Sequence, residues 1–389
     1  MRRRSRCIGE ITGTTVPKRS AEQLVREAAV DFDSFYAARI GEAIEPPDGE
    51  ILVGAIDCKG IPMVKPERAL RVVRRGKGEK ANKKRMATVA AVHSQPPIVR
   101  TPAQVIDSLF QTDAQVDPPK RAKPNRKRVW ASLTSSKDTF INDVKAEMIR
   151  RDPKHERTWV IVTDGERALQ RRVIKTFENV TLVLDLLHVL DKLWKAAHVL
   201  HPEGSHEAEA FVRHRAERIL CGMAGQVVKG LRQTVTKRRL TGQKAKTIRG
   251  VADYLYSNRD RMRYDHYLSN GWPIASGTVE GACKNLIRDR FERSGMRWTI
   301  QTAEALLRLR AAHLSHDFND YWETPHPNRP ATALPQGRLA TRPKVATPAR
   351  YSAVRSSAAN LYSRCSQIGA AWVFGHHSVQ NPNTSMKWR

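Results

Sequence analysis

Apolar, β-favouring runs alternate with helical stripes along the first half of this chain. Residues 159–163 and 180–184 are two such runs, and residues 166–177 between them carry apolar side chains at helical spacing. We therefore predict two buried strands joined by a helix. The strands stop at Asp164 and Asp185. Ligands of open α/β sheets bind at the carboxyl ends of the strands, so both acids are candidates for chemistry.

Three further strand-like runs precede this pair. Residues 51–56 end at Asp57, residues 86–93 have the character of a strand covered on both faces, and residues 129–133 form the third. A short helix is predicted near residues 103–110, and a longer one, capped by Ser136, through about residue 151. The order of strands and longer helices is that of an α/β, ribonuclease-H-like mixed sheet flanked by helices.

The second half of the chain has a helical pattern. Residues 189–271 contain no strand signal and are rich in Lys and Arg, so we interpret them as an all-helical insertion. Such a section can clamp, dimerise or bind a duplex, and the pattern does not separate these roles. At the amino end of the chain, Ser20 is predicted to cap a helix that reaches about residue 40. A plain packing helix is favoured there over the second helix of a helix-turn-helix whose first half ends near Gly13.

A third acidic position follows the helical section. Ser276 or Thr278 is predicted to cap a helix in which Glu280 occupies the first turn, where the positive end of the helix dipole favours a carboxylate. Lys284 and Arg288 follow on the same side. Two interpretations remain open: a solvent-exposed Glu280–Lys284 pair, or an acid at a metal with cations behind it for phosphates.

Asp185 and His188 are three residues apart, a spacing that places them on one side of a helix. An Asp after a strand is more often a helix cap than a ligand, and a single His is more often structural. The number of acids at strand ends, rather than any one of them, favours a functional interpretation.

Charge narrows the class of partner. The 389 residues carry a formal net charge of +29, and a polyanion such as nucleic acid would neutralise it. Residues 118–128 hold six basic residues and no acid, which suits a solvated loop or a loop that contacts phosphates. The five cysteines are dispersed without a C-x-x-C pair, which argues against a disulfide framework or a zinc finger. No long apolar run or signal peptide is visible, so we expect a soluble, cytoplasmic (nucleoid-associated) protein with no membrane partner.

Three segments carry a resemblance to a known family: VTDGERAL, LDLLHVLDKLW and PIASGTVEGACKNLIRDRFERSGMRW. Together they resemble bacterial insertion-sequence transposases of the DDE type, in the Kra family of the Mutator-like group. The resemblance extends from about Ser20 to Trp322 and is most specific between Glu280 and Trp298.

The resemblance implies a ribonuclease-H-like core with an α-helical insertion before the last catalytic acid. The catalytic and metal-binding triad would be Asp57, Asp164 and Glu280, supported by Asp185 and His188. Two Mg²⁺ or Mn²⁺ ions would serve phosphodiester hydrolysis and strand transfer, a chemistry that suits hard oxygen ligands. DNA, both transposon ends and target, would be the partner of a homo-oligomer. The DNA contacts would include Lys284, Arg288, Arg297 and Trp298.

The expected organisation has five parts. They are a basic, helical amino-terminal segment that could be a truncated DNA-binding region, the first part of the core, the helical insertion, the last part of the core and a disordered basic tail: residues 1–44, 45–188, 189–271, 272–323 and 324–389. The tail contains no Asp or Glu and is rich in Pro, Ala, Ser, Thr and Arg. The alternative function is a non-catalytic DNA-binding remnant of a truncated transposase.

Overall fold

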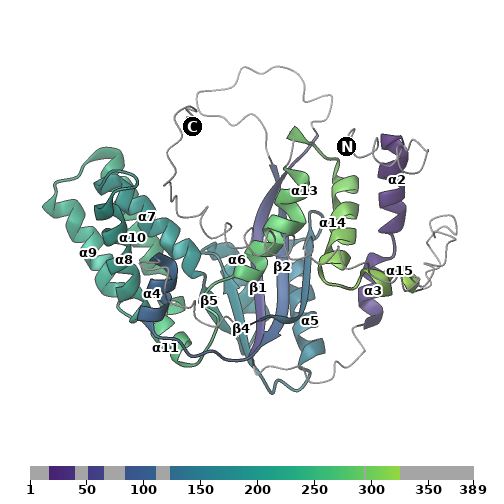
Figure 1. The fold of residues 1–389 in the computed structure, drawn as a ribbon, viewed down its shortest axis with the longest axis horizontal. Helices are drawn as coiled ribbons and strands as arrows, with labels where there is room; N and C mark the ends of the chain where they lie inside the picture. The colour runs from purple at the N-terminus through teal and green to yellow at the C-terminus, as the bar shows by residue number, and fades with distance from the viewer. Residues whose placement is uncertain (1–16, 40–50, 65–83, 111–122, 293–294, 325–389) are drawn as a thin grey trace, which may run out of the picture. The chain divides into compact units, whose positions relative to one another are not determined.

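A mixed five-stranded sheet forms the centre of the fold (Figure 1). The computed structural model describes residues 17–39, 51–64, 84–110, 123–292 and 295–324. The strand order is β3-β2-β1-β4-β5, and the strands are β1 (Ile51–Pro62), β2 (Lys84–Gln95), β3 (Asn125–Ser132), β4 (Thr158–Thr163) and β5 (Thr181–Leu184).

The pairing directions give the sheet its ribonuclease-H-like character. β1 pairs with β2 and β2 with β3 in antiparallel fashion, whereas β4 runs parallel to β1 and β5 runs parallel to β4. The sheet is therefore an antiparallel meander extended by two parallel strands. This α/β arrangement confirms the predicted fold class.

Helices cover both faces of the sheet. On one face lies α5 (Lys137–Arg151), whose buried side includes Phe140, Ile141, Val144 and Met148; Ser136 caps it, as predicted. Gly54 of β1 faces this helix, and its missing side chain leaves room for Met148. Successive residues of a strand point to opposite faces, so Asp57 faces the other side, where α12 (Gly277–Ala282) and the following π-helix η4 (Cys283–Arg288) lie.

The remaining helices lie around this core. α6 (Arg167–Thr176) packs beside α5, and α14 (Ile300–Leu314) contacts β3. From β5 to α12 the described residues form helices and no strand. These are α7 (Leu186–Leu200), α8 (His206–Leu220), α9 (Ala224–Lys237), α10 (Gly242–Asn258) and α11 (Tyr264–Ser269), which Figure 1 shows beyond the β5 edge of the sheet. α4 (Pro102–Phe110) packs against α8.

The amino-terminal helix differs from its prediction. α2 (Lys18–Ala28) begins before Ser20, with Pro17 at its cap, because the Pro17 carbonyl accepts the Ala21 amide. The Ser20 cap is therefore wrong. The helix also stops at residue 28 and restarts as α3 (Phe32–Ala38), instead of running on to residue 40.

Both helices have a packing role. α2 contacts α14, and the aromatic rings of α3 pack on Tyr321 of α15 (Phe318–Glu323). This supports the packing-helix interpretation. The predicted first half of a helix-turn-helix, near Gly13, lies outside the described residues.

Two other sequence interpretations change. β3 begins at Asn125, so the last part of the basic run 118–128 is a strand and not a loop. Arg128 pairs with buried Glu147 at 2.6 Å, which removes it from the candidate phosphate contacts. The predicted disordered tail lies outside the described residues beyond residue 324, and the division into five parts stays a prediction. None of the described helices has the length and apolar character needed to cross a membrane.

Candidate active site

Three neighbouring strands present an acid at the same level of the sheet. β1, β4 and β5 are paired in register up to Ile56, Thr163 and Leu184, and the residues that follow are Asp57, Asp164 and Asp185. The amide of Asp185 also donates to the Thr163 carbonyl at 2.9 Å, which continues the alignment by one step. Neighbouring strands are about 5 Å apart, so the register places these carboxylates in one row.

The expectation that β1 ends at Asp57 is wrong. β1 continues to Pro62 because its antiparallel pairing with β2 persists to the Pro62–Lys84 pair. Only its parallel partner β4 stops, at Thr163. Asp57 is therefore a residue within a strand, at the point where the parallel half of the sheet ends.

Asp57 is held by two donors. One carboxylate oxygen accepts the amide of Cys58 at 2.6 Å, and the other accepts the thiol of Cys283 at 3.4 Å. Burial and the charge of Asp57 raise the pKa of the Cys283 thiol, so Cys283 stays protonated and donates. The three described cysteines are free thiols, and two of them, Cys58 and Cys283, lie beside this acid.

The negative charge of Asp57 acts on both Asp164 and Glu280. Burial raises the pKa of Asp164; the amide of Glu166, which donates to it at 3.0 Å, opposes this shift, and the charge of Asp57 adds to it. Partial loss of surrounding water also raises the pKa of Glu280, and the charges of Asp185 and Asp57 raise it further. The charge of Asp57 therefore acts on two acids, Asp164 and Glu280, that are each more than a hundred residues from it in sequence. Their catalytic role stays a prediction.

Asp185 has the role of a helix cap and of a partner for His188 at once. Its side chain is 1% exposed, accepts the amide of Leu187 at the start of α7, and lies 3.2 Å from His188 Nδ1. The hydroxyl of Ser276 also donates to it. Ser276 therefore caps no amide of α12, contrary to one predicted alternative, because Asp185 takes its hydroxyl.

His188 faces the acids. Its hydrogen bond to Asp185 raises its pKa, burial opposes this, and the charges of Asp185, Asp57 and Asp164 add to the increase. The neighbouring carboxylates therefore favour the protonated form of the imidazole.

Of the four predicted DNA contacts, three are exposed and one is not. Lys284, Arg288 and Arg297 are exposed, and their contact with DNA stays a prediction. Trp298 is only 5% exposed; its indole packs on Phe291 and donates to the Phe291 carbonyl at 3.3 Å. We therefore correct this assignment: Trp298 holds the segment that follows η4 against β1, where its backbone pairs with Pro62 and Val64.

No ion pair joins Glu280 to Lys284, so the interpretation as a solvent-exposed pair is also wrong. The positive charges that act on Glu280 are those of His188 and of Lys59 on β1. Sequence reasoning missed Lys59 because Lys59 and Glu280 are adjacent only in the fold. The alternation of β1 could have indicated it, since Lys59 lies on the same face as Asp57.

Tyr254 is a further residue that the sequence did not indicate. It lies on α10, and its ring covers Gly165, the residue after Asp164. Burial raises its pKa, with the charge of Asp164 adding to this, while the Gly165 amide donates to its hydroxyl and opposes the increase. A buried amide pair supports the same contact: Gln170 donates to the Asp164 carbonyl at 3.0 Å and to Asn258 at 3.1 Å. The end of α10 therefore holds the Asp164 turn.

A side chain at residue 165 should disturb this turn. The Cβ of a Gly165→Ala variant would overlap the Tyr254 ring, so either the ring or the Asp164 turn must move. We expect any metal-dependent nicking of DNA to fall about 10–100-fold, because a displacement near 1 Å at a reacting group has an effect of that order. Gly230→Ala on α9, where nothing lies within 4 Å, is the matched control. Tyr254→Ala should restore activity to the Gly165→Ala chain, and full activity of Gly165→Ala alone would contradict the role of this contact.

The donor set suits a hard divalent cation. Carboxylate oxygens are the preferred ligands of Mg²⁺, which is usually held by one or two carboxylates with water and substrate phosphate completing its shell. Burial is the largest cause of the raised pKa values of Asp164 and Glu280, and the charge of Asp57 adds to both. In the part of the chain described, no three His, Cys, Asp or Glu side chains converge to hold an ion by themselves. The site therefore fits ions that share their ligands with a substrate better than a closed metal cage.

Comparisons with known proteins add little to this geometry. No protein-family model matches the chain, and no curated protein matches it. Among solved structures it is similar to the Drosophila P element transposase strand transfer complex, with 9% identity, a TM-score of 0.24, and coverage of 80% of this chain and 81% of that chain. A similarity at that level carries no argument about function. Membership of the Kra family finds no support in these comparisons and stays a prediction.

Proposed function

We propose that this chain is the transposase of an insertion sequence, which hydrolyses phosphodiester bonds at the element's ends and transfers the freed 3′-hydroxyl into target DNA. The observation that carries the proposal is the position of Asp57 and Asp164 side by side where the parallel strands end, with the charge of Asp57 acting on both Asp164 and Glu280. The net charge of +29 supports DNA as the partner.

In this proposal Asp57, Asp164 and Glu280 would hold two Mg²⁺ or Mn²⁺ ions, which would supply activation of the attacking oxygen and stabilisation of the leaving one. Asp57 would be the central acid of the three, because its charge acts on Asp164 and on Glu280. The buried Asp185 holds His188 in place, and the protonated imidazole donates to a phosphate oxygen of the scissile strand. Arg288 and Lys284 contact phosphates further along the strand.

Nicking of plasmid DNA that carries the genomic flanks of this reading frame tests the proposal. The wild-type chain should nick it with Mg²⁺ or Mn²⁺ and not with EDTA. Asp164→Asn and Glu280→Gln should each lower the rate about 10³-fold, the order of one lost transition-state contact of about 4 kcal/mol. DNA affinity should stay within about twofold of wild type, and Asp138→Asn, an exposed acid on α5, should be fully active.

Binding without any metal-dependent nicking would favour the second candidate, a non-catalytic DNA-binding remnant. The structural observation on that side is that no three potential ligands converge among the described residues. Salt-sensitive DNA affinity does not separate the two functions, because both predict it.

A further inference from the structure

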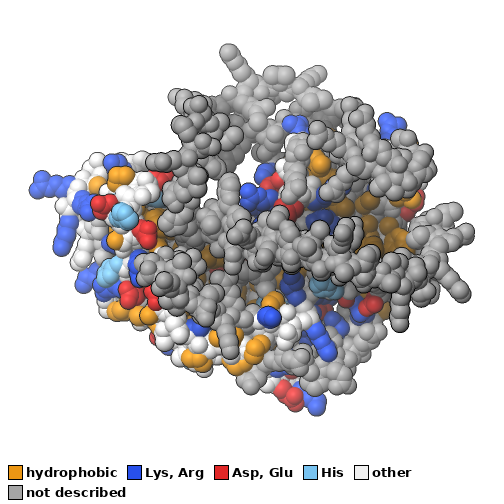
Figure 2. All heavy atoms as spheres, viewed as in Figure 1, with side chains coloured by type: hydrophobic (Ala, Val, Ile, Leu, Met, Phe, Trp, Pro, Cys, Tyr) orange, Lys and Arg blue, Asp and Glu red, His pale blue; other side chains and the backbone are white. Residues whose placement is uncertain are grey.

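Two helices of the all-helical section, α9 and α10, carry a continuous run of positive charge. Residues 224–252, which comprise α9, the turn after it and most of α10, contain eight Lys and Arg residues and no Asp or Glu. All eight are exposed. Blue Lys and Arg side chains project in Figure 2 from the edge of the view where Figure 1 places α9.

Among the described residues, ion pairs neutralise little of this charge. Arg232 pairs with Asp253 at 2.9 Å, and within the part of the chain described it is the one member of the set with an acidic partner. The turn itself is the most basic point, since it follows Lys237 with Arg238 and Arg239. Burial lowers the pKa of Arg215 on α8 to about 10, and the positive charges of Arg218 and Arg238 lower it further. Like charges are therefore held close together at this end of the helical section.

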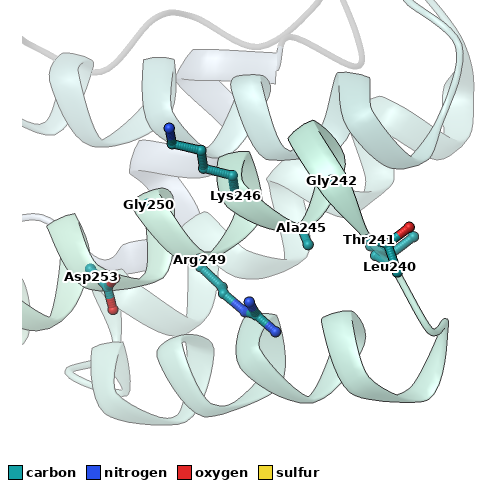
Figure 3. Close-up of a pocket in the computed structure, with 8 residues that line it drawn as sticks. All are labelled: Leu240, Thr241, Gly242, Ala245, Lys246, Arg249, Gly250 and Asp253. Atoms are coloured by element: carbon teal, nitrogen blue, oxygen red, sulfur yellow. The ribbon is translucent and has the colours of Figure 1, made fainter.

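The surface beside this turn is hollowed. Figure 3 shows an open hollow along α10, of about 560 Å³, which Lys246, Arg249 and Asp253 help to line. Lys246 and Arg249 project from α10 in different directions in this view. The hollow is open to solvent, which suits the backbone of a polymer better than an enclosed small molecule.

We propose that this basic face of α9 and α10 binds the phosphate backbone of duplex DNA, at a place separate from the acid cluster. The inference rests on the proposed function for its choice of DNA. α10 begins at Gly242 on the basic face and reaches Tyr254 beside Asp164, a distance of roughly 18 Å at 1.5 Å per residue. One helix thus joins the two places. A duplex that contacts both would be held by phosphates about half a helical turn from the bond to be cut.

Charge neutralisation tests this face against the rest of the surface. The test chain carries Lys237→Gln, Lys246→Gln and Arg249→Gln. The control chain carries Lys154→Gln, Arg171→Gln and Lys175→Gln, and so loses the same net charge. The control positions are exposed and lie toward the other end of the sheet, since α6 runs back from the acids to the start of β5 and Lys154 precedes β4.

The measurement is the affinity for a 30-base-pair duplex of roughly random sequence, in EDTA, between about 50 and 200 mM salt. The test chain should bind at least about tenfold more weakly, and the slope of log affinity against log salt should fall by about two to three, one for each lost phosphate contact. The control chain should stay within about twofold of wild type.

Equal losses in both chains would show that affinity follows net charge alone and would overturn the proposal, as would no loss in either. Thermal unfolding of both chains should match that of the wild type, because all six substitutions are on exposed side chains. The assay uses no metal and reads no cleavage. The binding result can therefore support the proposed DNA contact even if the protein does not nick DNA. It can also refute this contact even if the protein does nick DNA.

Discussion

Asp57→Asn is expected to abolish metal-dependent nicking, with a loss of at least about 10³-fold, while leaving the fold intact. Asp57 is the acid whose charge acts on Asp164, Glu280 and His188 together, so its neutralisation affects every other member of the cluster. The amide of Asn can keep an oxygen toward the Cys58 amide. The substitution therefore changes charge more than shape.

The same variant should also separate metal binding from stability. Mn²⁺ should raise the melting temperature of the wild-type chain and have little effect on Asp57→Asn, because a ligand stabilises only a protein that binds it. Without metal, Asp57→Asn should be as stable as wild type or more stable, since one of several mutually repelling carboxylates is gone. Asp138→Asn is the matched control, and nicking by Asp57→Asn at more than a tenth of the wild-type rate would remove Asp57 from the proposed triad.

Glu147→Gln is expected to destabilise the fold by about 3 kcal/mol, the largest effect on stability that we foresee. Glu147 lies on α5 with a side chain 1% exposed, and its carboxylate accepts from Arg128, Arg150 and Arg151 at 2.6–3.1 Å. Arg151 is itself only 4% exposed. Removal of the negative charge would leave a buried guanidinium without a counter-ion.

The pH dependence of the free energy of unfolding should reveal the contribution of Glu147 and its three arginine partners. Burial favours the neutral acid, but the three guanidinium groups outweigh it and lower the pKa of Glu147 from 4.5 to about 2. A carboxyl group whose pKa is lower in the folded protein stabilises the fold at a pH above its unfolded-state pKa. This stabilisation is lost as the pH falls toward the folded-state pKa. Urea unfolding of the wild type should therefore show a loss between about pH 4.5 and 2 that Glu147→Gln lacks. The exposed Glu156→Gln should behave as wild type, and an unchanged acid profile in Glu147→Gln would contradict this account.

The strand acids were predictable because two local signals coincide at each of them. An apolar run predicts a strand, and the first acid after it lies at the carboxyl end of that strand. Asp164 and Asp185 could therefore be placed without tertiary information. Asp57 was placed on the correct edge for the wrong reason. Its strand continues because β2 keeps pairing with it, and no signal within residues 51–62 reveals a partner 30 residues away.

The errors share a physical origin. Trp298 was read as a surface contact, yet its indole fills the space beside Phe291, because burial of a large aromatic side chain outweighs any local preference. Lys59, Cys283 and Tyr254 were missed, since each reaches the cluster from an element that meets it only after folding. Local pattern predicts which elements form; the contacts between their side chains depend on the packing of the whole domain.

Glu280 lies in α12, which together with η4 packs on the sheet. It belongs to the segment whose Leu286 and Ile287, both fully buried, cover the face of β1 that carries Asp57. The Cys283–Asp57 contact spans 226 residues, so it can form only after that length of chain has been synthesised. Nascent protein that has not yet reached this segment holds at most two of the three carboxylates. Under the proposed function, a nascent chain could therefore not cut DNA before this segment has been synthesised and has packed on β1.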